Sequence, residues 1–570
     1  MSPPPTTTAG SAPIVIVGGG PTGLTAAILL AQHGLPVAIL ERHLTPYPHP
    51  RAVHLDDEVH RILQQVGIAP AFARISRPGA GLRVLDAGQE VLAEFRRSPH
   101  GPHGYPQANM FDQPELEGLL RDRLASRHPE VAFHRGVEVT DVRTAAPGGV
   151  GSGGSVGSVA SSTARTPRPV VSFRDARVAD GPIRQIEAAA VLGCDGATSI
   201  VRERIGSTWR DLAFEQRWLV VDGRCPYPLA AWDGVDHVAD PRRAATFMRV
   251  GEDRYRWEFR LHAHEDEDVL QQPAELRRLL SPWLGDLPPE AVELLRSAGY
   301  TFRARVARRW RSGRVLLLGD AAHLTPPFIG QGLGAGLRDA SNLSWKLARV
   351  LTGDAPDSLL DSYESERRRH VTHQIRLART VGWALTGTGR DAGHAGDAAR
   401  RGALGAVLRL SRLAPGALDR GSPALRGSSL TAGRRPTGRR SLIGTLVPQP
   451  DVIDGEVTRA LDGILGRRSA VLTLTAPDPE LLALAARIGA RVLYVDGCPL
   501  RGTSPTPGVR TIDGGGTLAR WLGDVRATAA VVRPDRVVVA VAGSSTHPGR
   551  ELAAFAACEA LAMTRDRSLV

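Results

Sequence analysis

Cysteine is scarce in this sequence. The chain of 570 residues has four cysteines, which stand far apart at Cys194, Cys225, Cys498 and Cys558 and form no CxxC pair. So few cysteines cannot form a disulfide framework that stabilises a chain of this length, and their spacing fits neither a zinc knuckle nor a dithiol redox motif. We therefore expect no metal site, no disulfide framework, and a location in the reducing cytoplasm.

Lysine and long apolar runs are also missing. Lys346 is the single lysine among 71 basic residues, so the net charge of +12 comes from arginines spread along the chain. The densest arginine clusters, at 303–311 and 434–440, lack the interleaved aromatic residues of a nucleic-acid stacking surface. No apolar run approaches the ~18 to 20 residues needed to cross a bilayer. The sequence thus predicts neither a nucleic-acid nor a membrane partner.

What is present is the composition of a globular protein. Hydrophobic residues make up 42% of the chain and charged residues 23%, which excludes disordered and collagen-like classes. A chain this long exceeds what one hydrophobic core usually organises, so two or three domains are expected. Residues 1–12 have neither the basic nor the apolar region of a secretion signal, and we predict a flexible tail there.

A dinucleotide-binding motif follows that segment. The stretch IVIVGGGPTGLTAAILLAQHGLPVAILER predicts a strand, a glycine turn, a helix over 22–33 and a second parallel strand over 37–40. Gly18, Gly20 and Gly23 form GxGxxG between the first strand and the helix. Such a turn lets a pyrophosphate approach the helix N-terminus, and Glu41, at the end of the second strand, can accept hydrogen bonds from ribose hydroxyls. A tight turn that merely packs is the alternative.

Two further glycine turns accompany it. One is LGCDGATSIVR at 192–202, and the other is LLLGDAAHLTPPFIGQGLGAGLRDASNLSWKLA at 316–348. Together with GxGxxG they resemble the three motifs of the class A flavoprotein aromatic hydroxylases. Taken singly, Asp320 could be a helix cap at a strand end and the pair Asp195 and Gly196 an ordinary turn.

The resemblance implies roles for particular residues. Asp320 would hold the ribose and ribityl side of FAD, and Asp195 and Gly196 would lie near the pyrophosphate and the nicotinamide approach. The helix beginning near Gly332 would stabilise negative charge on the flavin N1–C2=O edge. Residues expected to let backbone approach the flavin ring, or to contact it, are Pro327, Gly330, Gly332 and Leu333.

A narrower resemblance is to 3-(3-hydroxyphenyl)propionate and 3-hydroxycinnamate hydroxylases. It rests on YPHPRAVHLDDEVHRILQQVGI at 47–68, RWLVVDG at 217–223, RYRWEFRL at 254–261 and VVRPDRVVVA near 531–540. By this resemblance Arg42 and Arg51 lie along FAD, and Gln113 touches the cofactor. It also implies a C-terminal thioredoxin-like domain without the redox CxxC.

The expected fold is α/β, with four parts. A Rossmann-type FAD-binding domain is split into 13–208 and 301–400, and an antiparallel sheet domain for the substrate is inserted at 209–300. Residues 401–450 connect these to the thioredoxin-like domain at 451–570.

The expected reaction is hydroxylation of a phenolic ring ortho to its hydroxyl. Because the sequence has one dinucleotide fingerprint, NADH or NADPH is expected to bind transiently in the same groove. The resemblance implies that it reduces FAD, that O2 adds at flavin C4a, and that the resulting hydroperoxide delivers oxygen. Phenols attack best when ionised, so a base is needed; His54 and Tyr255 are candidates, although each could instead have a structural hydrogen bond. Asp56, Asp57 and Glu58 fit the acidic first turn of a helix.

Several alternatives stay open from the sequence. The chain could be a tailoring hydroxylase of a polycyclic polyketide or antibiotic, or a flavin-binding regulator without catalysis. The choice between NADH and NADPH is undecided, and a homodimer is an open option.

Overall fold

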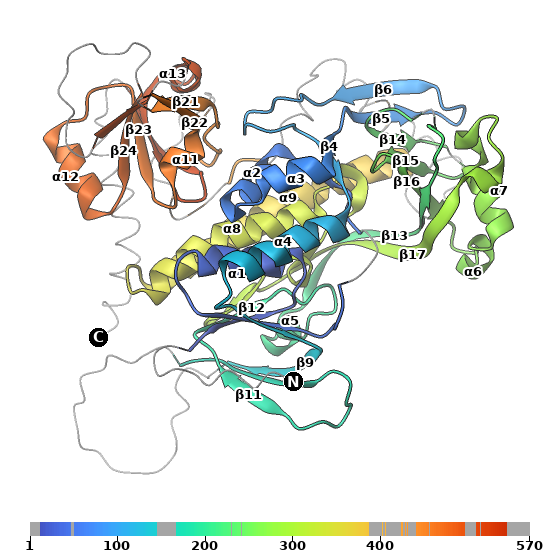
Figure 1. Ribbon diagram of the computed structural model, residues 1–570, viewed down its shortest axis with the longest axis horizontal. Helices are drawn as coiled ribbons and strands as arrows, with labels where there is room; N and C mark the ends of the chain where they lie inside the picture. The colour runs from blue at the N-terminus through green and yellow to red at the C-terminus, as the bar shows by residue number, and fades with distance from the viewer. Residues whose placement is uncertain are drawn as a thin grey trace.

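A computed structural model describes residues 12–46, 51–144, 167–386 except 230 and 241, 402, 405, 423–425, 428, 430, 441–495 except 455, and 509–543 except 513–514. Residues 1–11 of the expected tail at 1–12 and much of the connecting segment at 401–450 lie outside the described residues. The described chain forms a helix-covered parallel sheet, a large antiparallel sheet beside it and a smaller C-terminal module (Figure 1).

The first layer is a six-stranded sheet in the order β18-β19-β12-β1-β2-β8. Strands β19, β12, β1, β2 and β8 run parallel, and β18 pairs antiparallel at the edge. Strand β1 is apolar at all four positions and fully buried, as expected of a central parallel strand. Its strands are β1 (Ile14–Val17), β2 (Val37–Glu41), β8 (Ala132–Arg135), β12 (Ala190–Gly193), β18 (Arg311–Ser312) and β19 (Val315–Leu317).

Helices cover one side of this sheet, and a three-stranded sheet lies on the other side (Figure 1). The predicted helix after the glycine turn is α1, which packs against α8 and α4. The helices on that side are α1 (Pro21–Ala31), α2 (Asp57–Val66), α3 (Ala69–Ile75), α4 (Gln113–Arg127) and α8 (Gly332–Leu351), whereas α5 (Ile200–Arg204) lies on the opposite side against β9. The small sheet consists of β9 (Val137–Arg143), β10 (Val170–Asp175) and β11 (Arg184–Glu187).

The second layer is an eight-stranded sheet in the order β20-β17-β13-β16-β15-β14-β5-β6. Its strands are β5 (Gly81–Leu85), β6 (Val91–Arg96), β13 (Trp209–Arg224), β14 (Val235–Val238), β15 (Ala245–Arg249), β16 (Arg254–Leu261), β17 (Glu293–Ala307) and β20 (His323–Leu324). The predicted boundaries of 209–300 are too narrow, because β5 and β6 come from the earlier segment and β17 runs past residue 300. Parallel pairing of β14 with β5 joins the two segments.

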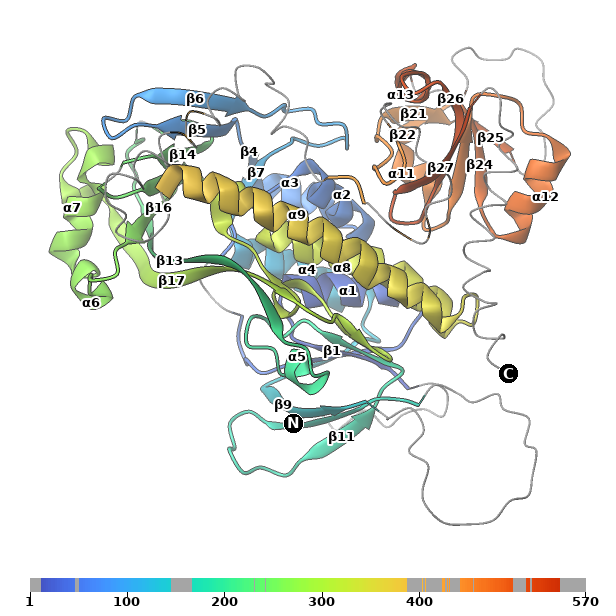
Figure 2. The ribbon, with the colours of Figure 1, turned by 180° about the vertical axis from the view of Figure 1, so that it is seen from behind.

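One face of this sheet forms its own hydrophobic core under α6 (Glu267–Leu270) and α7 (Pro273–Leu284). The other face looks toward the first layer. Helix α9 (Asp361–Thr386) bridges the layers, and Figure 2 shows its C-terminal end lying against the eight-stranded sheet. A further sheet, β3-β7-β4, lies beside α2 and α3, and its strands are β3 (His54–Leu55), β4 (Ser76–Pro78) and β7 (Asn109–Phe111).

The C-terminal module is a mixed five-stranded sheet in the order β25-β24-β23-β26-β27. Its strands are β23 (Ala470–Thr473), β24 (Arg491–Val495), β25 (Val509–Ile512), β26 (Ala527–Val532) and β27 (Val538–Gly543). Beside the sheet lie the hairpin of β21 (Asp451–Asp454) and β22 (Val457–Ala460) and the helices α11 (Leu461–Leu465), α12 (Pro479–Arg487) and α13 (Thr517–Gly523). The thioredoxin-like assignment of this module stays a prediction.

Buried ion pairs attach the module to the first layer. The guanidinium of Arg533 donates to both carboxylate oxygens of Glu366 on α9, at 2.6 and 3.0 Å, and the ammonium of Lys346 on α8 donates to the same carboxylate at 2.8 Å. Nearby, Arg61 on α2 forms a two-pronged pair with Asp462 at 2.6 and 2.9 Å. Because these charges are desolvated, the pairs fix where the module docks.

Within the described residues, no helix is both long and apolar enough to span a membrane. The same part of the chain contains no cluster of three or more histidine, cysteine or acidic side chains arranged to hold a metal.

Candidate active site

The three glycine turns predicted from the sequence come together in space. They follow β1, β12 and β19, which are adjacent and parallel, so their carboxyl ends meet at one edge of the sheet. Gly20, Gly196 and Asp320 of the three turns all line one cavity. Ligands of open α/β sheets bind at this edge.

The first turn is packed too closely for any side chain at two of its glycines. Gly18 has φ +103°, and a Cβ there would lie 2.4 Å from the carbonyl oxygen of Cys194 in the second turn. A Cβ on Gly23 would lie 2.1 Å from the carbonyl oxygen of Gly18. These glycines let strand, helix and neighbouring turn approach one another, while Gly20 has open space before it, where a pyrophosphate fits.

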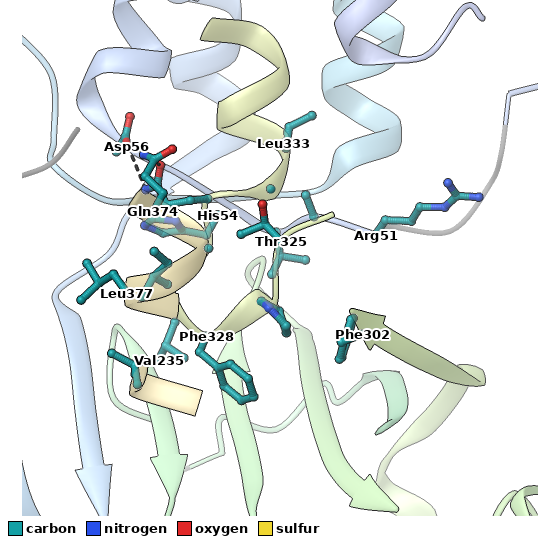
Figure 3. A pocket seen from close by; sticks show the side chains of 18 of the residues that line it. Arg51, His54, Asp56, Val235, Phe302, Thr325, Phe328, Leu333, Gln374 and Leu377 are labelled. Atoms are coloured by element: carbon teal, nitrogen blue, oxygen red, sulfur yellow. Dashed lines mark hydrogen bonds between the residues drawn. The ribbon is translucent and has the colours of Figure 1, made fainter. Parts of the chain in front are cut away.

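The cavity has a volume of about 1100 Å³. Single-ligand pockets span roughly 300–1,000 Å³, so there is room for a cofactor together with a small substrate. Figure 3 shows the cavity between the sheet strands and the first turn of α8, with Phe302 on one side and Gln374 and Leu377 of α9 on the other.

Two helices present their N-termini to this cavity without a capping side chain. The N-cap residues are Gly20 for α1 and Gln331 for α8, and neither makes a side-chain cap hydrogen bond. The free N–H groups and the positive dipole end of each helix therefore favour a bound anion. One helix end suits a pyrophosphate and the other a flavin N1–C2=O edge, so the residues present fit FAD.

The second and third turns are held by hydrogen bonds within the protein. Asp195 accepts from Ser199 Oγ at 2.6 Å and from the Val201 N–H at 3.1 Å, so its carboxylate holds the start of α5, while its neighbour Gly196 faces the cavity. Asp320 is solvent-accessible because it faces the cavity. Burial among surrounding protein atoms raises the pKa of Asp320, and electrostatic interactions with His323 and Arg51 partly offset this.

Asp339, which the sequence analysis did not select, fixes the third turn from behind. Its fully buried carboxylate accepts from the Gly319 N–H at 3.0 Å, from His323 Nε2 at 2.7 Å and from Arg367 Nε at 2.8 Å. Burial raises the pKa of Asp339, but His323 and Arg367 lower it further, so the net direction is downward. The carboxylate thus joins α8 and α9 to the turn that carries Asp320.

The other expected cofactor residues divide into two groups. Pro327, Gly330, Gly332, Leu333, Arg51 and Gln113 line the cavity. Gln113 is held in place, because its Oε1 accepts from the Ala52 N–H at 2.7 Å. In Figure 3, Leu333 lies above the cavity and Arg51 extends away from it.

Glu41 and Arg42 do not line the cavity. The Glu41 carboxylate accepts from the Gly19 N–H at 2.7 Å and from the His43 N–H at 2.8 Å, and so braces the glycine turn. Arg42 is exposed and donates to His43 Nε2 at 3.0 Å. Their direct contact with the cofactor stays a prediction.

His54 lies at the cavity wall beside the cofactor turns. Its Nδ1 is buried and packs closely against Gly330, since a Cβ added to Gly330 would lie 2.6 Å from it. Burial lowers the pKa of His54, so the imidazole is neutral near pH 7. Asp56, expected in the first turn of a helix, instead caps α2: it accepts from the Val59 N–H at 3.0 Å and pairs with Arg338 at 2.5 Å.

Tyr255 does not reach the cavity, which removes the basis for its candidacy as a catalytic base. Its side chain is buried in the core under α6 and α7, stacked with Phe247, and its hydroxyl accepts from the Leu229 N–H at 3.3 Å. Side chains alternate between the two faces of a strand. On β16 the odd-numbered residues point into that core, whereas Arg256 and Glu258 line the cavity.

Sequence reasoning missed the polar residues on the cavity side of the eight-stranded sheet. Arg256 pairs with Asp222 at 2.8 and 3.0 Å, and Glu258 and His237 are buried beside it in the cavity lining. Alternation in RYRWEFRL separates these charged residues from the aromatic ones. That pattern could have grouped Arg256 with Glu258, but it could not show which face of the strand meets the cofactor.

Comparisons with known proteins agree with this site. The family model described as an FAD binding domain matches residues 11–149 and 161–378, and the model described as an HcaD C-terminal domain matches 444–557. A 3-(3-hydroxy-phenyl)propionate/3-hydroxycinnamic acid hydroxylase of Burkholderia cenocepacia is 34% identical over 566 residues, covering 94% of this chain and 95% of the relative. A probable NADH-specific resorcinol 4-hydroxylase of Rhodococcus jostii is 32% identical over 530 residues, covering 92% and 90%.

Solved structures share the fold. Aklavinone-11 hydroxylase in complex with FAD and aklavinone aligns with a TM-score of 0.71 at 20% identity, covering 96% of this chain and 99% of that one. The flavin-dependent monooxygenase PieE aligns with a TM-score of 0.75 at 21% identity, covering 98% and 100%. With the three turns converging on one cavity, the matched family model and the full-length relatives, the chain belongs to the family of FAD-dependent aromatic hydroxylases.

Proposed function

We propose that this protein hydroxylates a phenolic ring ortho to its hydroxyl, with 3-(3-hydroxyphenyl)propionate or 3-hydroxycinnamate as substrate and a reduced nicotinamide as electron donor. One observation carries the proposal: the cavity that receives the three cofactor turns is closed on its opposite side by the eight-stranded sheet. A flat aromatic ring therefore has a place between the flavin side and the sheet. The names of the full-length relatives support the substrate class.

FAD in this site supplies redox chemistry, using electrons from the nicotinamide and oxygen from O2. The residues that would hold it are those of the three turns, with the N-terminus of α8 beside the ring. The protein's other task is to exclude water from the reacting groups. Apolar side chains on the cavity wall serve this end, namely Leu82, Val84, Phe95, Met248 and Phe328.

The cavity also suits an anionic substrate side chain. Arg97, Arg256 and Arg303 are among its lining residues, of which Arg256 also pairs with Asp222 and Arg303 with Glu215. Guanidinium groups bind carboxylates with charge-assisted hydrogen bonds. A propionate or acrylate group on the ring would therefore be attracted to this cavity, whereas a neutral polycyclic substrate would gain nothing from these charges.

The test is a substrate panel with the purified, FAD-loaded protein. NADH and NADPH are each supplied with 3-(3-hydroxyphenyl)propionate, 3-hydroxycinnamate, resorcinol or a polycyclic phenol. Nicotinamide oxidation, O2 uptake, peroxide release and product mass are measured together. We expect the two carboxylated phenols to accelerate nicotinamide oxidation and to gain one oxygen atom each.

The outcomes separate the alternatives. Peroxide without hydroxylated product from the carboxylated phenols, together with turnover of the polycyclic phenol, would favour a tailoring hydroxylase. Failure of both nicotinamides to bleach the bound flavin, with or without phenols, would favour a regulator without catalysis. The cytoplasmic location and a homodimer stay predictions.

A further inference from the structure

A row of side chains crosses the cavity side of the eight-stranded sheet. Val220 on β13 is opposite Glu258 on β16, Glu258 is opposite Thr246 on β15, and Thr246 is opposite His237 on β14. Residues directly opposite on neighbouring strands have Cβ atoms about 4.5–5.5 Å apart. All four side chains line the cavity, so Glu258, Thr246 and His237 form a polar strip across its floor beside the apolar Val220.

Glu258 is the member of this row without a partner. It is 8% exposed, and its side chain makes no hydrogen bond or ion pair with any residue that the structure describes. The nearest charges are Arg256 and Asp222, which are paired with each other at 2.8 and 3.0 Å. A buried carboxylate normally has hydrogen bonds, so this one is open to a donor from a ligand.

The rest of the row is occupied. His237 Nδ1 and Thr246 Oγ1 lie 2.9 Å apart and share a hydrogen bond, and His237 also bonds the backbone of Phe328. Burial lowers the pKa of His237 to about 4, so its ring is neutral near pH 7. The neutral pair forms a rigid polar edge next to Glu258 and does not compete for its carboxylate.

The other carboxylates that line the cavity are committed elsewhere or sealed. Asp56 is bound by Arg338 and by the start of α2. The Oδ2 atom of Asp57 is buried and packs closely against Gly101, since a Cβ added to Gly101 would lie 2.3 Å from it. Asp320 belongs to the third cofactor turn. Of these carboxylates, Glu258 alone is on the sheet, across the cavity from the turns that hold FAD.

We propose that Glu258 is a catalytic residue that accepts the proton of the substrate's phenolic hydroxyl during hydroxylation. This inference rests on the proposed function, because it assigns the base of that reaction. As the ortho carbon forms its bond to oxygen, the electron pair of the breaking O–H bond moves into the ring and the proton passes to the Glu258 carboxylate. One oxygen atom of O2 enters the ring, the other leaves as water, and the nicotinamide supplies the two electrons.

The electrostatics of the site support this role. Burial raises the pKa of Glu258, Arg256 lowers it and Asp222 raises it, with a net upward shift. A general base is most effective when its pKa lies near the operating pH, and an ordinary glutamate has a pKa of about 4.3. A carboxylate of raised pKa is therefore a better acceptor than an exposed one.

The experiment compares Glu258→Gln and Glu258→Asp with the parent FAD-loaded enzyme. The substrates are the phenol that the parent hydroxylates best and ring-fluorinated versions of it with a more acidic hydroxyl. Glu293→Gln on β17 of the same sheet is the matched control, because that side chain is exposed and, among the residues that the structure describes, has only a long ion pair with Arg224 at 3.8 Å. Anaerobic flavin reduction and product formation are measured separately.

We expect Glu258→Gln to lower kcat for the ordinary phenol about 100- to 10,000-fold, with the rate rising steeply as the phenol becomes more acidic. Glu258→Asp should recover part of the rate because it restores a carboxylate, and flavin reduction and the control should be unchanged. If Glu258→Gln keeps the parent rate, or loses the same factor for acidic and ordinary phenols, Glu258 is not the base. If the parent itself hydroxylates no phenol, the proposed function fails, and this result is distinct from failure of the base assignment.

Discussion

Asp57 and Asp56 are neighbours at the start of α2, yet their carboxylates should affect stability in opposite directions. Asp57 is buried near Asp56 and Glu58, and its Oδ2 has no partner within the part of the chain that the structure describes. Burial, followed by repulsion from Asp56 and Glu58, raises its pKa from 3.8 to about 7. For Asp56, by contrast, burial raises the pKa, but pairing with Arg338 outweighs burial and the pKa falls from 3.8 to about 2.

The sign of the effect follows from proton binding. Between pH 3.8 and about 7 the folded protein holds a proton on Asp57 that the unfolded chain has lost, so stability decreases as pH rises through this range. At 1.36 kcal/mol per unit of pKa, the full cost above pH 7 is about 4 kcal/mol. For Asp56 the paired carboxylate contributes about 2 kcal/mol at neutral pH by the same conversion, and this is lost as pH falls from 3.8 through about 2.

The assay is chemical denaturation of the parent and of Asp57→Asn at about pH 4 and pH 8, below and above the window set by the Asp57 pKa values. The variant should match the parent at the lower pH and be more stable by up to about 4 kcal/mol at the higher pH. Asp56→Asn is the control of opposite sign and should destabilise the protein at pH 8. Parallel pH profiles for the parent and Asp57→Asn would refute the reasoning.

Three further predictions concern docking, cofactor binding and the second face of the sheet. Arg533→Met should release the C-terminal module, because the buried Glu366 carboxylate loses one of its cations at a cost of about 3–5 kcal/mol. Limited proteolysis should then cleave the chain before the module. An unchanged digestion pattern would contradict this prediction. Gly23→Ala should abolish FAD retention, because the new Cβ would lie 2.1 Å from the carbonyl oxygen of Gly18 in the glycine turn. FAD retention is measured as visible flavin absorbance after desalting. Gly118→Ala on α4 is the control, because its Cβ meets no atom within 4 Å and FAD should be retained. Tyr255→Phe should leave kcat unchanged while costing about 1 kcal/mol of stability for its hydrogen bond, and a large loss of kcat would restore its candidacy as the base.

Much of the cofactor site was predictable because its signals are local. A GxGxxG turn between a strand and a helix specifies backbone positions within a few residues, and the turns at Gly196 and Asp320 follow strands of the same sheet. The convergence of the three turns can be predicted because the carboxyl ends of parallel strands lie at the same edge of a sheet. Glu41 shows the limit of this reasoning, because its carboxylate braces the glycine turn through the Gly19 N–H.

The side of the cavity formed by the eight-stranded sheet was not predictable in the same way. The pattern of β16 shows that Tyr255 and Trp257 share one face and that Arg256 and Glu258 share the other, but both faces of this strand are buried. Which face meets the cofactor depends on where α7 and α9 pack. Contributions from β5 and β6, more than a hundred residues earlier in the chain, were equally hidden.

By itself, the sequence determined the cofactor class, the parallel-sheet layer and the motifs that carry them, since each depends on spacing within one βα unit. Tertiary structure alone decided that Glu258 lines the cavity, that Tyr255 lies in a separate core, and that Asp339 fixes the third turn. The physical reason is that these roles arise from contacts between strands and helices far apart in the chain. Hydrophobic periodicity indicates local secondary structure and does not predict such contacts.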